Sequence, residues 1–334
     1  MLGMILITIM LQPMKLTSLK LTSRHGLLLL GSLATLSLTA CSGNEAENTA
    51  NSVVIAASFY PIEEIVSNLS GGTIDVVGLT PPGVGAHDLE LTSEQLAELE
   101  ESDVLFYLGD GFQPGIEKII TSLPKSVRVI DLLGKISVRN IVPQLEGLEG
   151  ETDGEALESG KDPHVWLDPA NMIIMANEIR EVLKDIDGVD QDSVDSSMSS
   201  YVAELNKLGS EFDNGLKECE SNVIVTSHRA FEYLAARTNL KQVAIAGVNP
   251  DSEPSTKSMQ EIAKFAKANK VSTIFFETLL PEDLARTIAS EIGAKTDLLD
   301  PIEGFSKEDL DAGANYIVAQ RANLERLRTG LKCK

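Results

Sequence analysis

Three histidines and one aspartate fall in irregular segments of the chain and could together bind a metal ion. His87 lies in a loop of prolines and glycines, His164 precedes a predicted helix, His228 directly follows a predicted strand, and Asp300 ends another strand. Imidazole nitrogens and a carboxylate oxygen are ligands that zinc prefers, and four of them complete a tetrahedral site. We therefore expect these four residues to form a zinc site, with manganese or iron as alternative ions.

Each of these residues has a simpler explanation when it is taken alone. His87 could belong to a solvated loop, His164 could be an ordinary loop histidine, His228 could cap a helix, and Asp300 could be part of a turn. Four such residues at strand ends and loop-to-helix junctions favour a common role over four separate ones. Glu277, which follows another predicted strand, is a rival fourth ligand or a partner that orients one of the histidines.

The elements that would position these residues alternate between strands and helices. The predicted strands are 53–57, 74–79, 104–108, 127–130, 223–226, 242–246, 273–276 and 296–299. The predicted helices are 61–69, 92–101, 114–122, 169–186, 194–217, 230–237, 255–268, 281–292 and 306–331. This alternation predicts an α/β fold of two similar lobes, each with a mostly parallel four-stranded sheet.

One predicted helix is long enough to join the two lobes. From 194 to 217 the apolar residues recur every three or four positions, which is the period of an amphipathic helix. We therefore expect an N-terminal lobe at 53–188, a connector at 189–220 and a C-terminal lobe at 221–334. Ligands of parallel sheets bind beyond the carboxyl ends of the strands, so the metal site should lie in the cleft between the lobes.

The N-terminal region has the composition of an export signal. Residues 1–40 contain three basic residues, no acidic residue and a late apolar run, which together predict a signal peptide. The sequence Leu-Thr-Ala before Cys41 is similar to a lipobox, so we expect lipid attachment at Cys41; a plain secretory signal is the alternative. Residues 41–52 are small and polar, as in a flexible tether. A complete signal starts at Met14, where we expect translation to begin.

No other stretch approaches the ~20 apolar residues of a membrane-spanning helix. The mature protein is therefore expected to be extracytoplasmic and held at the cell membrane by its lipid anchor alone.

The charge of the chain limits its partners. There are 28 basic and 50 acidic residues, a net charge of −22, and removal of the three basic residues of the signal would leave −25. Nucleic acid is excluded as a partner, whereas cations suit an acidic surface, which also promotes solubility. Residues 146–162 hold seven acidic residues and one lysine, and we expect a solvated surface loop there. Cys219 and Cys333 could form a disulfide or stay as separate thiols.

Six short motifs together resemble a known family. They are GAHDLE at 85–90, PHVWLDP at 163–169, SHRAFEYLA at 227–235, EPS at 253–255, FFE at 275–277 and LDP at 299–301. In this order they resemble the metal-binding lipoproteins, or solute-binding subunits, of bacterial zinc and manganese ABC importers. The resemblance covers essentially the whole mature chain.

The resemblance implies a fold, a role and a ligand set. It implies two α/β lobes joined by one rigid helix, with one ion bound by His87, His164, His228 and Asp300. The ion would be delivered to an ABC permease with a cytoplasmic ATPase, and the protein itself would be a monomer and no enzyme. Manganese members usually carry a glutamate at the position of His228, so the resemblance favours zinc, as does ligand preference. Many zinc members also have a histidine-rich loop, which is missing at 146–162.

Two functions of other classes stay open. A secreted zinc hydrolase would use three histidines and keep one position for water, but no His-Glu-x-x-His motif is present. A surface adhesin with a structural ion is the other. For the metal carrier we expect affinity to fall as the pH drops through about 6.5, because the histidines bind metal only when neutral.

Overall fold

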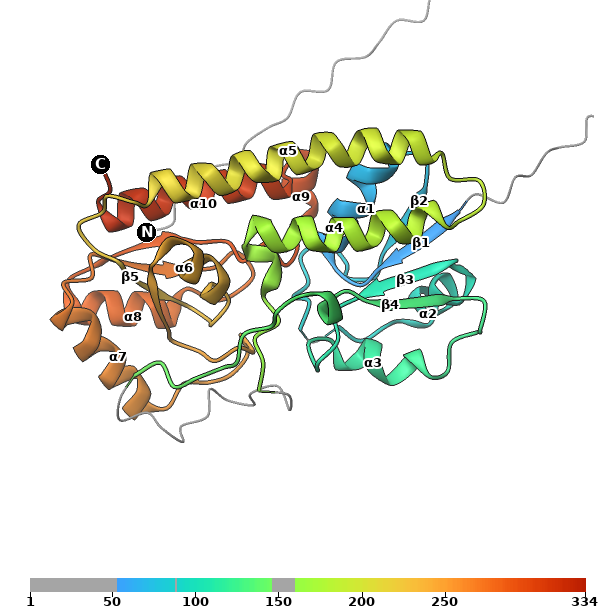
Figure 1. Cartoon of the computed structure of the whole chain (residues 1–334). Coiled ribbons are helices and arrows are strands. Elements are labelled where there is room, and N and C mark those ends of the chain that lie inside the picture. The colour runs from blue at the N-terminus through green and yellow to red at the C-terminus, as the bar shows by residue number, and fades with distance from the viewer. Residues whose placement is uncertain (1–52, 88, 146–159) are drawn as a thin grey trace, which may run out of the picture. The chain divides into compact units, whose positions relative to one another are not determined.

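The computed structural model describes residues 53–87, 89–145 and 160–334 (Figure 1). The predicted signal peptide, the lipidation site at Cys41, the tether and most of the acidic loop lie outside these residues. The described residues form one compact unit, within which the two halves of the chain each build a sheet.

The first half forms a parallel four-stranded sheet, which we call the first lobe together with its helices. The strand order is β2-β1-β3-β4. The strands are β1 (Val54–Ala57), β2 (Asp75–Gly78), β3 (Val104–Tyr107) and β4 (Arg128–Asp131), and the helices between them are α1 (Tyr60–Ser70), α2 (Ser93–Glu101) and α3 (Pro114–Ile120). In the centre of the sheet Ile55 pairs with Val76 on one side and Val104 on the other. Apolar residues on neighbouring strands thus meet helices on both faces.

The second half repeats this arrangement and forms the second lobe. Its parallel sheet has the order β6-β5-β7-β8, which is the same pattern as in the first lobe. The strands are β5 (Val223–Thr226), β6 (Lys241–Ala244), β7 (Thr273–Phe276) and β8 (Lys295–Leu298), and the helices are α6 (Glu232–Thr238), α7 (Thr256–Ala268) and α8 (Asp283–Ile292). All four residues of β5 are buried, as expected for a central parallel strand. The predicted α/β fold with two similar four-stranded sheets is confirmed.

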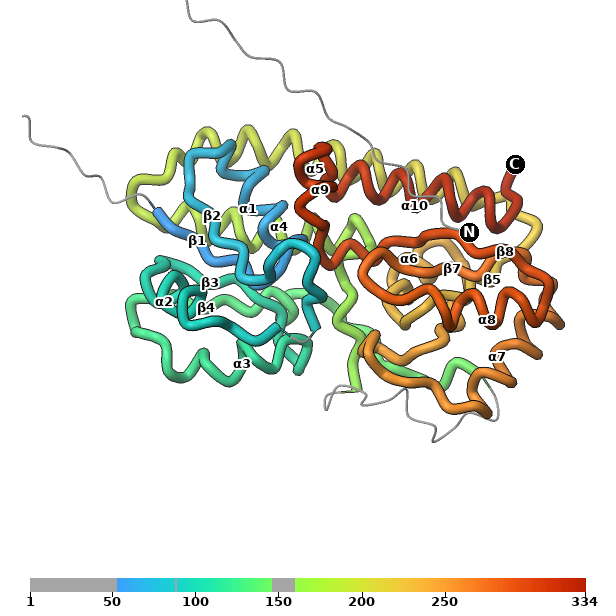
Figure 2. Tube along the Cα trace, turned by 180° about the vertical axis from the view of Figure 1, so that it is seen from behind, coloured from blue at the N-terminus to red at the C-terminus, as the bar shows by residue number. Residues whose placement is uncertain are grey.

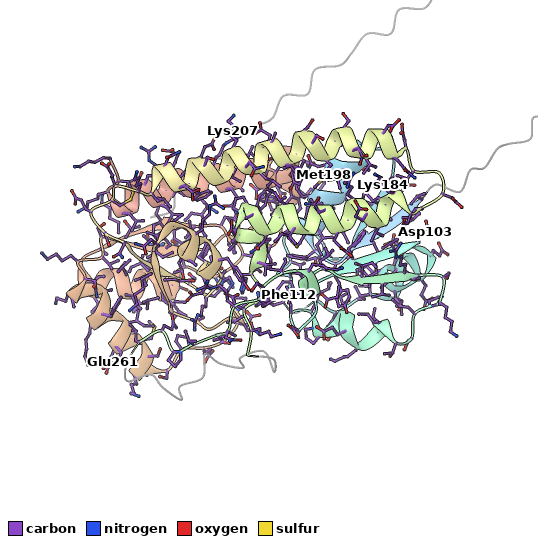
Figure 3. The ribbon with its side chains drawn as sticks, viewed as in Figure 1. Asp103, Phe112, Lys184, Met198, Lys207 and Glu261 are labelled. Atoms are coloured by element: carbon purple, nitrogen blue, oxygen red, sulfur yellow. A yellow bond between two sulfur atoms is a disulfide. The ribbon has the colours of Figure 1, made fainter. Side chains whose placement is uncertain are left out.

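A long helix packs against both lobes. α5 (Gln191–Gly215) follows α4 (Pro169–Lys184) and contacts α1 and α4 on one side and α6 and α10 (Tyr316–Leu331) on the other (Figure 1). Figure 3 shows Met198 on the inner face of α5 and Lys207 on its outer face, and Met198 is buried while Lys207 is exposed. The predicted helix at 194–217 is therefore present and begins three residues earlier.

The prediction of a single terminal helix at 306–331 is wrong in one respect, because the structure has two helices there. α9 (Lys307–Asp311) ends before Gly313, which has a φ of 88°, and α10 begins after Asn315. A left-handed glycine interrupts the helical hydrogen bonds. The Asn315 side chain then accepts a hydrogen bond from Val318 N and starts the new helix.

The segment after β4 leaves the first lobe and attaches to the second. Gln144 accepts a hydrogen bond from Ala244 N at 2.6 Å and donates one to Ala244 O at 3.2 Å. Arg139 N donates to the hydroxyl of Tyr233 on α6, and Asn140 forms an isolated antiparallel bridge with Lys161. Sequence patterns gave no sign of this crossing, since the segment contains no regular strand.

Cys219 and Cys333 are joined by a disulfide, which ties the end of α5 to the C-terminus. Within the described residues, no helix is both long and apolar enough to cross a membrane.

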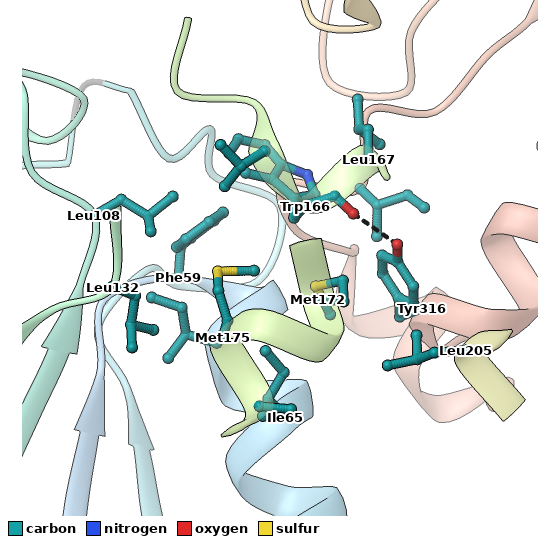
Figure 4. Close-up of a cluster of buried hydrophobic side chains, with 14 of the residues drawn as sticks. Phe59, Ile65, Leu108, Leu132, Trp166, Leu167, Met172, Met175, Leu205 and Tyr316 are labelled. Carbon is teal, nitrogen blue, oxygen red and sulfur yellow. Dashed lines mark hydrogen bonds between the residues drawn. The ribbon is translucent and has the colours of Figure 1, made fainter. Parts of the chain in front are cut away.

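The main hydrophobic core extends across both lobes. Its largest fully buried side chains include Phe59, Trp166, Phe212, Phe275 and Tyr316. Figure 4 shows Trp166 between Phe59 and Tyr316, in the segment just before α4. The centroids of the Phe59 and Trp166 rings are 4.8 Å apart in an edge-to-face arrangement, which favours a fixed ring orientation. The core thereby fixes the segment that carries His164.

Candidate metal centre

His87 lies in the long loop between β2 and α2 and is 4% exposed. The buried side chain of Gln113 donates hydrogen bonds to Ala86 O and Ser58 O, at 3.3 and 3.4 Å. The His87 ring packs edge-to-face on Phe112, with the centroids 4.9 Å apart. An irregular loop of prolines and glycines has no ladder of backbone hydrogen bonds, so these contacts fix the position of His87 instead.

His164 lies on the segment between Pro163 and the short helix η2 (Val165–Leu167), and it is fully buried. One carboxylate oxygen of Asp162, Oδ1, contacts His164 Nδ1 at 2.8 Å and accepts a hydrogen bond from His164 N at 3.0 Å. Asp168 then accepts from Ala170 N and caps α4, as its position before Pro169 predicts. The backbone and the ring of His164 are therefore fixed by the same local turn.

His228 follows β5 directly and is also fully buried. Glu277, at the end of β7, contacts His228 Nδ1 through Oε2 at 2.6 Å and accepts from His228 N through Oε1 at 2.9 Å. Thr226 and Gln242 both donate to His228 O, at 2.8 and 3.1 Å. Of the two roles considered for Glu277 from the sequence, these contacts fit that of a partner that orients a histidine.

Glu303 lies in the loop after β8 and brings a carboxylate to the three histidines. Its Oε1 atom is 3.3 Å from the Nε2 atoms of His87 and His228 and 3.7 Å from that of His164. This oxygen is buried and has no hydrogen-bond partner among the described residues. A buried carboxylate oxygen without a donor is costly unless a proton or a cation lies next to it.

The four groups have the spacing of a tetrahedral site. Nε2 of His164 lies 3.2 Å from Nε2 of both His87 and His228, and all four ligand atoms lie within 4.8 Å of one another. Zinc bonds nitrogen and oxygen at about 2.0–2.1 Å, and the edges of a tetrahedron with such bonds are about 3.3–3.4 Å. Five of the six separations are 3.2–3.7 Å, close to these edges, and the sixth pair, His87 and His228, lies within 4.8 Å, so the four groups fit a small ion at their centre.

The hydrogen bonds of two rings decide where their lone pairs point. An ionised carboxylate only accepts hydrogen bonds, so Nδ1 of both His164 and His228 carries the proton that faces Asp162 and Glu277. In the neutral rings Nε2 then has the lone pair, and the two lone pairs face each other at 3.2 Å. Such an arrangement is repulsive unless a proton or a metal ion lies between them, and this tautomer is the one that binds a metal through Nε2.

The pKa values of the four groups are shifted by burial and by the charges close to them. Burial opposes a charge on His228, but the carboxylates of Glu277 and Glu303 outweigh it and raise the pKa of His228 to about 10. Burial likewise opposes charge on His164, whose pKa is nevertheless raised by Asp162 and Glu303. For His87 burial prevails and lowers the pKa. Burial opposes ionisation of Glu303, but the three surrounding imidazoles hold its pKa well below the usual range.

The structure differs from expectation at the fourth group. It brings His87, His164 and His228 together with Glu303, whereas Asp300 lies outside this group of ligand atoms. Oδ1 of Asp300 instead accepts a hydrogen bond from Ile302 N at 2.8 Å. Sequence reasoning missed Glu303, although it lies only three residues beyond Asp300 in the same loop after a strand end.

A cavity of about 260 Å³ adjoins the four groups. It is lined by His87, Glu277, Asp300 and Glu303 and by parts of the loops at 83–85 and 278–280. Asp300 is 7% exposed, and burial raises its pKa to about 6, with Glu277 and Glu303 adding to the rise. Asp300 therefore faces the same space as the site without belonging to the cluster.

Comparison with known proteins identifies relatives of this chain. A family described as ZnuA, zinc-uptake complex component A, periplasmic, matches residues 55–330. The zinc-binding lipoprotein AdcA of Streptococcus pneumoniae is 34% identical over 305 residues, which cover 90% of this chain and 60% of that protein. The high-affinity zinc uptake system protein ZnuA of Bacillus subtilis is 31% identical over 309 residues, which cover 89% of this chain and 94% of that protein.

Solved structures agree with this family. The Zn(II)-bound ZnuA-like domain of S. pneumoniae AdcA matches with a TM-score of 0.69 and 31% identity, over 84% of this chain and 99% of that domain. The chain spans only about 60% of the length of the complete pneumococcal relative, so the comparison concerns that part alone.

Proposed function

Because the chain belongs to the family of periplasmic zinc-uptake components, we propose that it captures one Zn²⁺ ion outside the cytoplasm and delivers it to an ABC-type permease. The observation that carries this proposal is the convergence of three imidazole nitrogens and one carboxylate oxygen within 4.8 Å, all buried. The resemblance of the motifs to solute-binding subunits of zinc and manganese importers, stated from the sequence, agrees with this membership.

The ligand set proposed for the ion is His87, His164, His228 and Glu303. Three nitrogen ligands and one oxygen ligand suit zinc, because harder ions such as Mn²⁺ prefer oxygen and a higher coordination number. The carboxylates of Glu303, Asp162 and Glu277 offset the two positive charges of a buried ion.

Four protein ligands support transport over catalysis. A hydrolytic zinc site needs one coordination position for water, and here the fourth corner of the tetrahedron is taken by Glu303. Two ligands come from residues before α5 and two from residues after it, so a movement of one lobe against the other would break the site and release the ion. The protein would act as a monomer and be anchored through lipid on Cys41.

Elemental analysis tests the proposed function. The purified protein is equilibrated with equal concentrations of zinc, manganese and iron, freed of unbound metal and analysed. We expect one zinc per chain, lost in His164→Ala and in Glu303→Ala. The absence of any stoichiometric metal in the unsubstituted protein would refute the proposal, and one manganese per chain would refute the choice of zinc.

A further inference from the structure

The turn that carries Glu303 contains a residue in an unfavourable backbone conformation. Ile302 has a φ of 56°, which is the left-handed region, and its side chain is fully buried. A β-branched residue rarely adopts this conformation, which is strained and persists only where the surroundings enforce it. Contacts of the turn with the rest of the protein must therefore hold Ile302 in the left-handed conformation.

Three side chains hold the backbone on the N-terminal side of Glu303. Asn323 on α10, fully buried, accepts from Asp300 N at 2.9 Å and donates to Asp300 O at 2.7 Å. The Trp166 indole donates to Pro301 O at 2.7 Å. Finally, Asp300 Oδ1 accepts from Ile302 N at 2.8 Å. Consecutive peptide groups of the turn thus each have a fixed partner.

One of these partners, Trp166, belongs to a connected hydrogen-bond network. The Tyr316 hydroxyl on α10 donates to Trp166 O at 2.6 Å (Figure 4) and accepts from the buried Gln320 side chain at 3.1 Å. Trp166 lies two residues after His164. The same tryptophan therefore connects the segment that carries a histidine with the turn that carries the carboxylate.

A second connection between the two lobes lies beside this turn. Gly83 N, in the loop that carries His87, donates to Phe305 O at 2.9 Å. Figure 2, from behind, shows this loop after β2 near the segment that precedes α9. The position of Glu303 relative to His87 and His164 is thus fixed through backbone and side-chain contacts on both sides of the turn.

We propose that Asp300, Asn323 and Trp166 are positioning residues that hold the left-handed turn at Ile302 and so aim Glu303 at the three imidazoles. The proposal rests on the function proposed above. It assigns Asp300 the role of a hydrogen-bond acceptor for Ile302 N, in place of the ligand role expected from the sequence. Supporting groups of this kind keep a ligand in place before the ion arrives, and their loss typically weakens metal binding about 10- to 100-fold.

The choice of substitution at Asp300 separates the two roles. Asp300→Asn keeps an oxygen that can accept from Ile302 N but removes the charge that a metal ligand needs. Asp300→Ala removes both. The matched control is Asp311→Asn, because Asp311 is exposed on α9 and pairs only with Lys307 among its described ion-pair partners.

Cobalt(II) is the probe, because its visible absorption is intense in a tetrahedral site and weak in sites with more ligands. We expect Asp300→Ala to bind Co²⁺ about 10- to 100-fold more weakly with a loss of the tetrahedral bands, and Asp300→Asn to recover most of both. Trp166→Phe, which keeps the ring packing and removes the indole donor, should also weaken the bands.

Three results would decide against the proposal or against its premise. If Asp300→Asn lost as much affinity as Asp300→Ala, Asp300 would be a ligand and the positioning role would be overturned. If Asp300→Ala and Trp166→Phe both folded and kept the affinity and bands of Asp311→Asn, the turn would need no support. If the unsubstituted protein bound neither Co²⁺ nor Zn²⁺, the proposed function itself would fail.

Discussion

His164 and His228 face each other through their Nε2 atoms at 3.2 Å, although they lie on opposite sides of α5 in the chain. Each ring also has its Nδ1 atom against a buried carboxylate, Asp162 for one and Glu277 for the other. The carboxylate for His164 comes from its own segment, and the one for His228 comes from the end of a neighbouring strand of the same sheet. What lies between them, a proton or a metal ion, is the variable on which the following expectations depend.

The affinity for zinc should rise with pH over a wide range. The carboxylates next to His228 raise its pKa to about 10, and the pKa of His164 is raised as well, so the metal-free protein holds protons that zinc must displace. Each displaced proton makes the affinity up to about tenfold higher per pH unit, until the pH passes the pKa of that group. Zinc affinity should thus keep rising from mildly acidic pH to well above neutrality. For histidines with an ordinary pKa it would change only around and below pH of about 6.5.

Competition with a chelator of known affinity at several pH values measures this dependence. Glu303 should not contribute to the change of zinc affinity with pH, because its pKa is held well below its usual range and its carboxylate is ionised throughout. An affinity that stays constant from mildly acidic to mildly alkaline pH would contradict this expectation.

Glu277→Gln should weaken zinc binding about 10- to 100-fold without removing a ligand. The carboxylate of Glu277 accepts from both Nδ1 and the backbone N of His228, and an amide can accept through only one of its two terminal atoms. Zinc titration of this variant is compared with Glu291→Gln, whose side chain is exposed on α8. Equal affinities of the two variants would show that the orientation of His228 does not depend on Glu277.

Zinc should stabilise the fold without being required for it. A ligand present at about a thousand times its dissociation constant adds about 4 kcal/mol to the free energy of unfolding. The large core shared by both lobes should keep the metal-free protein folded. Thermal unfolding followed by circular dichroism, with zinc and with a chelator, should show the shift in the unsubstituted protein and none in His164→Ala. Loss of the folded signal on chelation would instead indicate a structural ion, as in the adhesin alternative.

The disulfide between Cys219 and Cys333 should contribute to stability and leave the metal site intact. It closes a loop over a sequence separation of 114 residues, for which loop entropy predicts about 4–5 kcal/mol, with measured values for native disulfides of about 2–5 kcal/mol. Denaturant unfolding of a variant with serine at both positions measures this difference. Zinc stoichiometry, determined on the same sample, should not change; its loss would show that the bridge helps to form the site.

Much of this arrangement could be predicted from the sequence because it depends on local patterns. The alternation of strands and helices and the caps at Thr92 and Asp168 follow from side-chain periodicity and hydrogen-bonding capacity. The convergence of the three histidines follows from their places after strand ends or before helix starts. The break between α9 and α10 was missed, because the apolar period continues across Gly313.

The sequence by itself determined two parallel sheets and a set of histidines after strand ends or before a helix start, since both depend on residue types a few positions apart. Only the tertiary structure decided which carboxylate of the last loop faces those histidines and that Cys219 pairs with Cys333. Asp300 turns to Ile302 N and Glu303 turns inward because Asn323 and Trp166, remote in the sequence, hold the turn in a left-handed conformation. Which of the two carboxylates faces the histidines is set by partners from other elements, so it cannot be read from a local sequence pattern.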